Sequence, residues 1–575
     1  MKIKHLFGLA VIAAMSASCS SNEDLGTAGP GTGTNEAGVG YASFSINLPT
    51  TRGTRATDPT FEKGDPNEYD VFNATLLVFK KSTTAGEGNY TLAEKVDLGS
   101  MEPWKIPDET GVTTQAKITA KLSNVDKSDD YFALVLLNNG SSTTDAKVTL
   151  PSEGETFSEW NVANNANATN FTDTKKGFYM ANAPLYNSTD KSVTTLVAIK
   201  KDKIFPTEAQ ASSGEAAADI YVERGLAKVT LTAATKDEKP VEGSTYTGDK
   251  VKISNWALDV TNKKTFPIHN VDGLTTDYED IWKNEAADGP STQRFVDNNQ
   301  KTLVKRVYWG KDPNYDNNAL LNTDEAGKTA RAAEFYYVTA NKDVTADPTK
   351  PLYCLENTFN LANMMQGQTT RVIFKASYTP KDFTAADGKT FYKVGTSVAL
   401  WKQKDLEDHI KAAVSKVFSV TTTDDITINL AAKGNDITAA GNHVITAANF
   451  TVKGHDAVKP EEEQAVNDKV GLTKDAGIST YANGESYYIA RIKHFGDDLT
   501  PWNSGETYND NLKYLGRYGM LRNNWYELEV NSVSGPGYPD VPEVKPNTPD
   551  DEDDKYINVS VKILDWAKRS QKVDL

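Results

Sequence analysis

The feature that most constrains this chain is a pair of strand-like segments, one near each end, with the same alternating pattern. Residues 41–49 read YASFSINLP and residues 556–566 read YINVSVKILDW. Every second residue is apolar in both, as in a β-strand that buries one face. The apolar residues are Ala42, Phe44, Ile46 and Leu48 in the first segment and Ile557, Val559, Val561 and Ile563 in the second. Two such equivalent strands indicate one groove that either of them can fill.

The segment before the C-terminal strand is rich in proline and acidic residues. It covers 536–555 and contains the run DDEDD at 550–554, which predicts a solvated, extended tether. Because a hairpin needs only a short loop, we do not expect so long a tether to fold the strand back as a neighbouring hairpin strand. We expect 556–575 to be a donor segment for another copy of the chain, and Trp566 to extend its contact.

The N-terminus has the pattern of an export signal. Lys2 and Lys4 precede an apolar run that is too short to span a bilayer. The segment MSASC then places Cys19 after small residues, as in a lipobox, although Ser16 stands where leucine is usual. Residues 1–19 are therefore predicted to be a lipoprotein signal peptide that ends in a lipidated, palmitate-bearing cysteine. We expect an outer membrane lipoprotein precursor, with ordinary secretion as the alternative.

Two arginines follow the first strand, within the segment TTRGTRATDP. No strand or helix pattern covers Arg52 and Arg55, so the backbone is expected to be open to proteolysis. An arginine-specific protease could cut at either position, and Arg55 is favoured because Ala56 is small. A linker with two solvated arginines is the alternative, but the duplicated strand favours cleavage. Residues 20–55 are thus expected to be a propeptide that carries the removable strand.

Short alternating runs between turn residues predict an all-β fold with a minor helix. The 38% hydrophobic content fits β-sandwiches, in which each strand exposes one face to water. We expect an N-terminal sandwich over 56–220 and a C-terminal sandwich over 221–535. One helix is expected at 404–418, capped by Asp405 and packed on a sheet. The expected strands include 71–79, 131–138, 176–185, 192–200, 221–233, 251–264, 369–378, 486–495 and a last one within 523–537 that buries Tyr526, Leu528 and Val530.

Little in the sequence points to chemistry. A net charge of −16 argues against nucleic-acid binding. No two histidines have metal-ligand spacing on one element, and no catalytic constellation is recognisable, so we expect no enzyme, cofactor or metal site. Cys354 is expected to be a small buried apolar residue. The alternative function is a monomeric glycan-binding surface lipoprotein, whose sugar-stacking side chains would be Trp282, Trp309 and Trp502.

Four motifs carry a resemblance to a known family. They are VERGLAKV at 222–229, LENT at 355–358, TTRVIFKA at 369–376 and RNNWYELEVNSVSGPGYP at 522–539. With the LDW–KVDL ending, they resemble the fimbrillins of Bacteroidales, the FimA/Mfa-like subunits of type V pili. The ending is most similar to that of the Mfa-type major fimbrium subunit. The resemblance covers the whole chain and is most specific at 522–575.

The resemblance implies two transthyretin-like β-sandwich domains and export as a lipoprotein. It also implies that an arginine-specific surface protease removes the first strand, and that the C-terminal strand of the next subunit fills the groove. Carried over by residue, it implies lipidation at Cys19, cleavage at Arg55 and a donor segment at 556–575. Because the chain has both a cut site and a donor, it is expected to be a stalk subunit of a cell-surface fimbria that supports adhesion. Its expected partners are other copies of itself and minor fimbrial subunits; its ligand on host or bacterial surfaces is not indicated.

Overall fold

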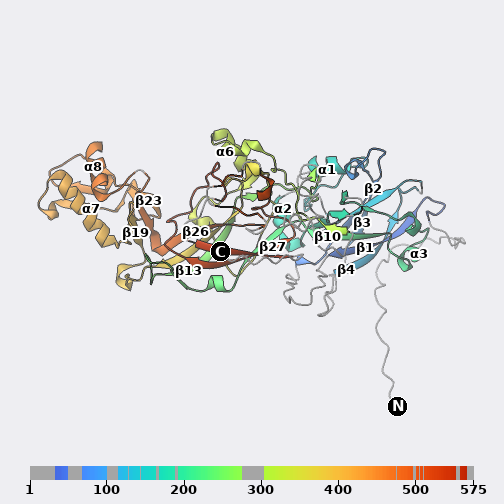
Figure 1. The fold of residues 1–575 in the computed structure, drawn as a ribbon, viewed down its shortest axis with the longest axis horizontal. Helices are drawn as coiled ribbons and strands as arrows, with labels where there is room; N and C mark the ends of the chain where they lie inside the picture. Colours follow the sequence, from blue (N-terminus) through green and yellow to red (C-terminus); the bar gives the residue numbers. More distant parts are fainter. Residues whose placement is uncertain are drawn as a thin grey trace, which may run out of the picture.

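The chain folds into an elongated molecule of several β-sheets with few helices (Figure 1). The computed structural model describes residues 33–48, 68–99, 114–126, 128–140, 142, 144–163, 168–187, 189, 192–274, 295, 304–473, 475–495, 500–503, 506–508, 511–551 and 557–565. The predicted all-β class with a minor helical part is confirmed. Among the described residues, no helix has the length and apolar character needed to cross a membrane.

The first lobe is built on one large sheet. Its strand order is β3-β2-β5-β6-β10-β1-β4, with β9 beside β5. These strands are β1 (Gly40–Leu48), β2 (Ala74–Lys80), β3 (Thr91–Gly99), β4 (Thr114–Leu122), β5 (Tyr131–Leu137), β6 (Met180–Asn182), β9 (Val197–Ala198) and β10 (Ala218–Arg224). The runs predicted as buried strands at 71–79 and 131–138 are β2 and β5, and both contribute to the core.

Short elements surround this sheet. They are the helices α1 (Phe157–Ala163), α2 (Ala168–Thr172) and α3 (Glu208–Ser213) and a small sheet of β7 (Leu185–Asn187), β8 (Ser192–Thr194) and β15 (Val304–Arg306). Helix α3 lies against β1 and β4. Its cover explains why β1 is buried on both faces.

The chain passes from the first lobe to the second within the predicted strand region 221–233. Strand β10 runs to Arg224, beyond the boundary expected at residue 220, and β11 (Ala227–Leu231) belongs to another sheet. Gly225 lies between them, and a Cβ at this position would lie 2.4 Å from the Phe171 ring. Only glycine lets the backbone pass so close to that ring.

The second lobe is a sandwich of two four-stranded sheets around a shared core. The sheet orders are β17-β11-β27-β28 and β12-β13-β18-β26. The strands not yet given are β12 (Lys239–Pro240), β13 (Lys250–Asp259), β17 (Leu352–Cys354), β18 (Arg371–Thr379), β26 (Glu485–Arg491), β27 (Asn524–Val533) and β28 (Ile557–Asp565). Tyr526, Leu528 and Val530 are buried on β27 as predicted, and so is Cys354. Beside the sandwich lie β14 (Thr261–Asn262), β16 (Phe335–Tyr336) and α6 (Glu325–Glu334).

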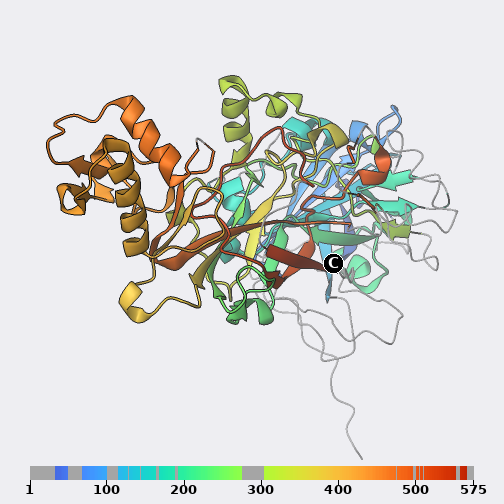
Figure 2. The same cartoon turned by 60° about the vertical axis from the view of Figure 1, so that its left-hand side comes forward.

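A third, small lobe is inserted between β18 and β26, which are neighbours in one sheet. It lies at the end of the molecule remote from the first lobe (Figures 1 and 2). Its elements are β19 (Phe391–Val394), α7 (Gln403–Phe418), β20 (Ile426–Ile428), β21 (Ala431–Ala432), β22 (Asn435–Asp436), β23 (Gly441–His443), β24 (Phe450–Val452), α8 (Pro460–Val470) and β25 (Ile478–Tyr481). This lobe has its own core.

The helix predicted at 404–418 is α7, and its apolar residues Leu406, Ile410 and Val414 are buried. The predicted cap is wrong, because Lys402 occupies the N-cap position and Asp405 lies within the first turn. Helix α7 packs against β20 and β19, each of which belongs to a small sheet, and also against α8.

A buried polar joint connects the first two lobes. The Glu68 carboxylate, which is fully buried, pairs with Lys228 Nζ at 2.6 Å and accepts a hydrogen bond from the Tyr353 hydroxyl at 2.7 Å. Arg224 Nε donates to the Glu68 carbonyl at 2.8 Å. Removing one partner would leave another charge buried, so these contacts tie the lobes into one body.

Candidate assembly sites at the two ends of the chain

Strand β1 is a central strand with a partner on each side. It pairs in parallel with β10 and antiparallel with β4. The predicted displaced residues Ala42, Phe44, Ile46 and Leu48 are at most 1% exposed. On the opposite face, Ser43 Oγ donates to the Ala211 carbonyl of α3 at 2.6 Å. Removal of this strand would therefore open a groove between β10 and β4.

The three large apolar residues of β1 supply much of the stability of this lobe. Burying each side chain contributes about 1.5–3 kcal/mol, so Phe44, Ile46 and Leu48 together contribute roughly 5–9 kcal/mol. The net stability of a whole domain is only about 5–15 kcal/mol. A groove left empty would thus endanger the lobe, and a replacement strand would restore it.

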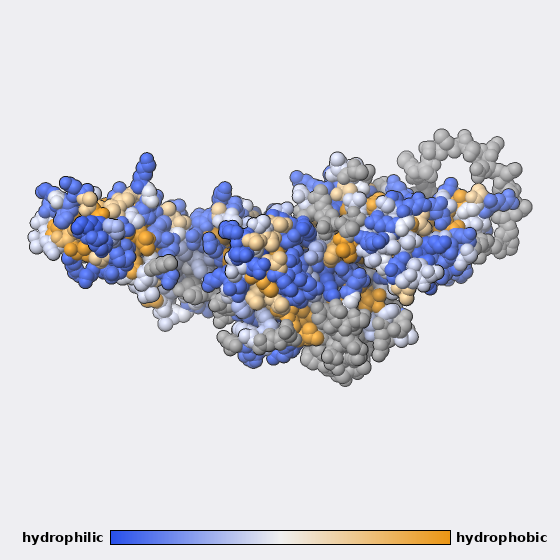
Figure 3. Space-filling model, turned by 90° about the horizontal axis from the view of Figure 1, so that it is seen from above, coloured by the Kyte–Doolittle hydropathy of each residue, from blue (hydrophilic) through white to orange (hydrophobic). Residues whose placement is uncertain are grey.

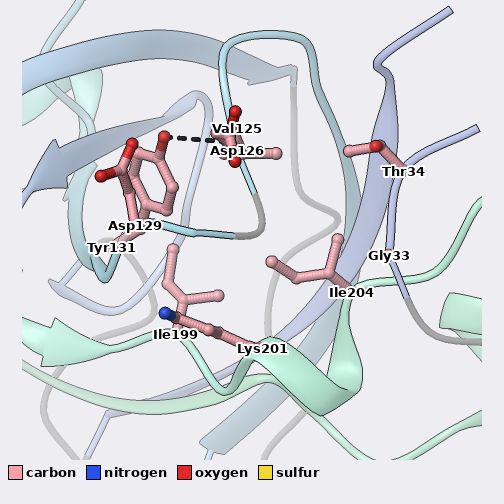
Figure 4. Close-up of a pocket in the computed structure, with 9 residues that line it drawn as sticks. All are labelled: Gly33, Thr34, Val125, Asp126, Asp129, Tyr131, Ile199, Lys201 and Ile204. Atoms are coloured by element: carbon pink, nitrogen blue, oxygen red, sulfur yellow. Dashed lines mark hydrogen bonds between the residues drawn. The ribbon is translucent and has the colours of Figure 1, made fainter.

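Residues just before β1 close a small cavity at the end of this groove (Figure 4). Gly33 N donates to the Ile204 carbonyl at 2.6 Å, which holds the segment in place. The cavity has a volume of about 20 Å³ and is lined by Gly33, Thr34, Val125, Asp126, Asp129, Tyr131, Ile199, Lys201 and Ile204. Because Gly33 and Thr34 form one wall, loss of the N-terminal segment would join the cavity to the groove.

The C-terminal strand β28 pairs with β27 of its own chain. The antiparallel ladder runs from Val533 opposite Ile557 to Asn524 opposite Asp565. The expectation that the long tether keeps this strand from its predecessor is therefore wrong. Ile557, Val559 and Val561 are half-buried against the core of the second lobe. The reason is that β27 offers an open edge, and the core offers apolar surface beside it.

The tether is also docked rather than solvated, and we call its described part, residues 536–551, the strap. Tyr538 exchanges two backbone hydrogen bonds of 2.8 Å with β26. Arg371 Nη2 donates to the Pro542 carbonyl at 2.8 Å, while its Nε pairs with Asp259 at 2.7 Å. Backbone and side-chain contacts thus hold the strap against the second lobe, while Glu543, Lys545, Asn547 and Pro549 remain exposed.

The end of the strap is held by a buried cluster that we call the latch, formed by Asp550, Asp551, Tyr508 and Arg517. The two carboxylates are 1% and 6% exposed, against the prediction of a solvated acidic run. Arg517 Nε donates to Asp551 Oδ1 at 2.8 Å, and the Tyr508 hydroxyl donates to both carboxylates. Burial, and then the neighbouring Asp551, raise the pKa of Asp550 to about 7. Asp550 and Asp551 are therefore anchors rather than solvated charges, and the rest of the acidic run, 552–554, lies outside the described residues.

The tryptophans expected of a glycan-binding protein are not all available for that role. Trp309 is fully buried in a core cluster, so it cannot stack on a sugar. Trp502 is half-buried, and its indole N–H donates to the Glu506 carbonyl at 3.0 Å. Trp282 lies outside the described residues.

Four further predicted site residues lie outside the described residues: Cys19, Arg52, Arg55 and Trp566. Ile563 is described in its backbone, where it pairs with Tyr526. In the described ranges, no group of three or more His, Cys, Asp or Glu side chains could hold a metal ion. Sequence reasoning missed the strap and the latch, because Tyr508 and Arg517 are far from 550–551 in the chain.

The described surface has few large apolar side chains. The face seen in Figure 3 is largely hydrophilic, with separate hydrophobic patches. Among the described residues, the exposed large apolar side chains are Phe72, Val162, Tyr221, Tyr336, Val398 and Val444, which come from different lobes. The terminal strands are therefore the better candidates for assembly.

The fold and these sites define a class: an all-β protein of several sheets, in which β1 is an inner strand and β28 an edge strand. Residues 479–572 match the family model for the C-terminal region of fimbrillin, the major fimbrial subunit protein type IV. The matched region holds β26, β27, the strap and β28. The resemblance to the fimbrillins is thereby confirmed for this part of the chain, which is similar to the C-terminal region of a major fimbrial subunit.

One solved structure shares most of its length with this chain. It is a proposed cell adhesion protein from Parabacteroides distasonis ATCC 8503, with 11% sequence identity and a TM-score of 0.39. The similarity covers 92% of this chain and 98% of that one. The comparison with curated proteins gave no match.

Proposed function

We propose that this protein is a stalk subunit of a cell-surface fimbria that polymerises by protease-triggered strand exchange and supports adhesion. The observation that carries the proposal is the position of β1. This strand is buried between β10 and β4, yet it belongs to the segment 20–55 that cleavage at Arg55 or Arg52 would detach. The C-terminal segment has the matching apolar residues.

The proposed sequence of events begins with an outer membrane lipoprotein precursor, lipidated at Cys19. An arginine-specific surface protease detaches the N-terminal segment, and β1 leaves. The donor residues Ile557, Val559, Val561 and Ile563 of another copy then take the places of the apolar residues of β1, and Trp566 extends the contact. Other copies and minor fimbrial subunits are the partners, and the chain has no enzymatic role.

Cleavage is needed because the two strands bury similar apolar surface. Each contributes several aliphatic or aromatic side chains at about 1.5–3 kcal/mol apiece, so neither wins by a wide margin. An uncut β1 also returns to its groove at the high local concentration set by its own chain. Once it is cut, it can diffuse away, and the donor takes its place.

The test uses full-length protein with Cys19→Ser, so that lipid does not cause association. Treatment with an arginine-specific protease should produce SDS-resistant ladders and filaments visible by electron microscopy. The Arg52→Ala/Arg55→Ala double variant should remain monomeric under the same treatment. Clean cleavage within 49–67 that leaves a stable monomer would refute the proposal.

A substitution in β28 tests whether this strand is the donor. Val561→Asp places a charge where a buried apolar side chain is expected, so it should block polymerisation while the subunit stays folded. Val561→Ile keeps the apolar character and should still polymerise. If Val561→Asp polymerises as well as Val561→Ile, another segment is the donor.

A further inference from the structure

The donor strand has a partner in its own subunit. In the chain described here β28 has one ladder, to β27, and lies at the edge of its sheet. Its residues Ile557, Val559 and Val561 are half-buried there. By contrast, β1 has ladders on both sides and its apolar side chains are fully buried. In the proposed exchange β28 therefore has two alternative sites, the edge of β27 and the groove of another subunit, and the groove buries a strand more completely.

We propose that β28 is stored on β27 before assembly, and that this self-pairing competes with insertion into another subunit. The inference rests on the proposed strand exchange and adds an inhibitory contact to it. Because a strand cannot pair in two places at once, storage and donation exclude each other. Storage also covers the apolar face of β28 and the open edge of β27, both of which invite aggregation.

Pairing of β28 with β27 is weaker than insertion of β28 into the groove of another subunit. Moving from β27 to a vacant groove gives β28 a second ladder of hydrogen bonds and completes the burial of its half-buried side chains. The exchange therefore runs from the edge to the groove once a groove is open. Before cleavage, β1 fills every groove, and β27 is the place left for β28.

The latch fixes the point from which β28 moves. Asp551 is held by Arg517, and six residue steps separate it from Ile557. At about 3.3–3.6 Å per residue, these steps reach roughly 20 Å. The strand can therefore leave β27 while the strap stays docked, provided that the acceptor groove comes within this distance of the latch. The partner is thus a second copy that approaches the latch closely.

A charge substitution on β27 tests storage without touching donor or groove. Glu527 pairs in register with Lys562, whereas Glu529 pairs with Ser560. Glu527→Lys opposes two lysines in the stored state, and like charges directly opposite each other weaken strand pairing. After cleavage, this variant should polymerise roughly two- to five-fold faster than the unchanged protein. Glu529→Lys is the matched control and should change the rate little.

Hydrogen exchange on the uncleaved protein gives a second readout. Because β28 has a partner on one side only, about every second amide of 557–565 points at β27 and should be protected, and Glu527→Lys should reduce that protection. Polymerisation that is unchanged or slower in Glu527→Lys, or full exchange of 557–565 in the unchanged protein, would overturn the inference.

An engineered disulfide between β27 and β28 distinguishes an error in the storage proposal from an error in the proposed strand exchange. Glu529→Cys with Ser560→Cys places two thiols at directly opposed positions, where Cα atoms lie at about 4.5–5.5 Å, suitable for a disulfide. The oxidised variant should not polymerise after cleavage, and reduction should restore polymerisation. If the unchanged protein fails to polymerise, strand exchange itself is refuted. If the disulfide does not form, or the oxidised variant polymerises freely, only storage is refuted.

Discussion

The Phe44→Ala variant should lose β1 much faster after cleavage than the unchanged protein. Phe44 is fully buried in the middle of the strand, where it pairs with Ala218 on β10 and Ile118 on β4. A buried phenylalanine reduced to alanine typically costs about 3–5 kcal/mol. If none of this packing remains in the transition state for release of β1, the whole cost lowers the activation free energy of release. At about 1.36 kcal/mol per tenfold change, release accelerates at least roughly 100-fold.

The assay follows the detached N-terminal fragment by size-exclusion chromatography after a short protease pulse, with polymer formation measured in parallel. Phe79→Ala is the matched control, because Phe79 is also fully buried in the first lobe but lies on β2, which is not removed. Both variants should lower the free energy of unfolding of the uncleaved protein by similar amounts. Only Phe44→Ala should show the large acceleration of release.

A milder change guards against loss of folding. Ile46→Val should cost about 0.5–1.5 kcal/mol, which corresponds to a release roughly two- to ten-fold faster. Equal acceleration by Phe44→Ala and Phe79→Ala would mean that β1 leaves only when the whole lobe unfolds. No acceleration by either Phe44→Ala or Ile46→Val would refute the role of β1 as the released strand.

Three further predictions concern the second lobe. The pKa of Asp550 is raised from 3.8 to about 7, so Asp550 binds its proton more tightly when the strap is docked. Docking of the strap should therefore be strongest below about pH 4 and should weaken as the pH rises through about 7. Hydrogen exchange of the strap, corrected for intrinsic rates, should show this pH dependence, and Asp550→Asn should abolish the pH dependence. Arg371→Met leaves the buried Asp259 carboxylate without its cation and should cost about 3–5 kcal/mol in denaturant unfolding, whereas exposed Lys404→Met should cost little. Burial raises the pKa of the Cys354 thiol to about 12, so it should react with a thiol reagent only after denaturation, and rapid labelling of the native protein would contradict its burial.

Local pattern predicts the regular elements of this chain well. The alternating or continuous apolar runs become β2, β5, β13, β18, β26 and β27, and helical spacing marks α7. These patterns suffice because each element buries its own apolar face, whichever partner it has. The parallel pairing of β1 with β10 could not be predicted, since it joins residues that are far apart in the chain.

The strap shows where local reasoning fails. A run of acidic residues normally stays in water, but here Asp551 meets Arg517 and Tyr518, which lie more than 30 positions earlier in the chain. No residue near 550–554 in the sequence predicts these partners. The pairing of β28 with β27 was missed for a related reason, because a docked strap does not behave as the flexible loop whose length argued against it.

The passage from β10 to β11 has a mechanical consequence for the proposed fibre. The two strands belong to different lobes and are separated by Gly225 and Leu226 alone, with Gly225 packed against Phe171. Tension between the lobes therefore acts along strand directions, so the hydrogen bonds of each ladder share the force rather than break one after another. With Glu68 and Lys228 bridging the same junction, each subunit should behave as a stiff segment, and the bending of a filament should concentrate between subunits.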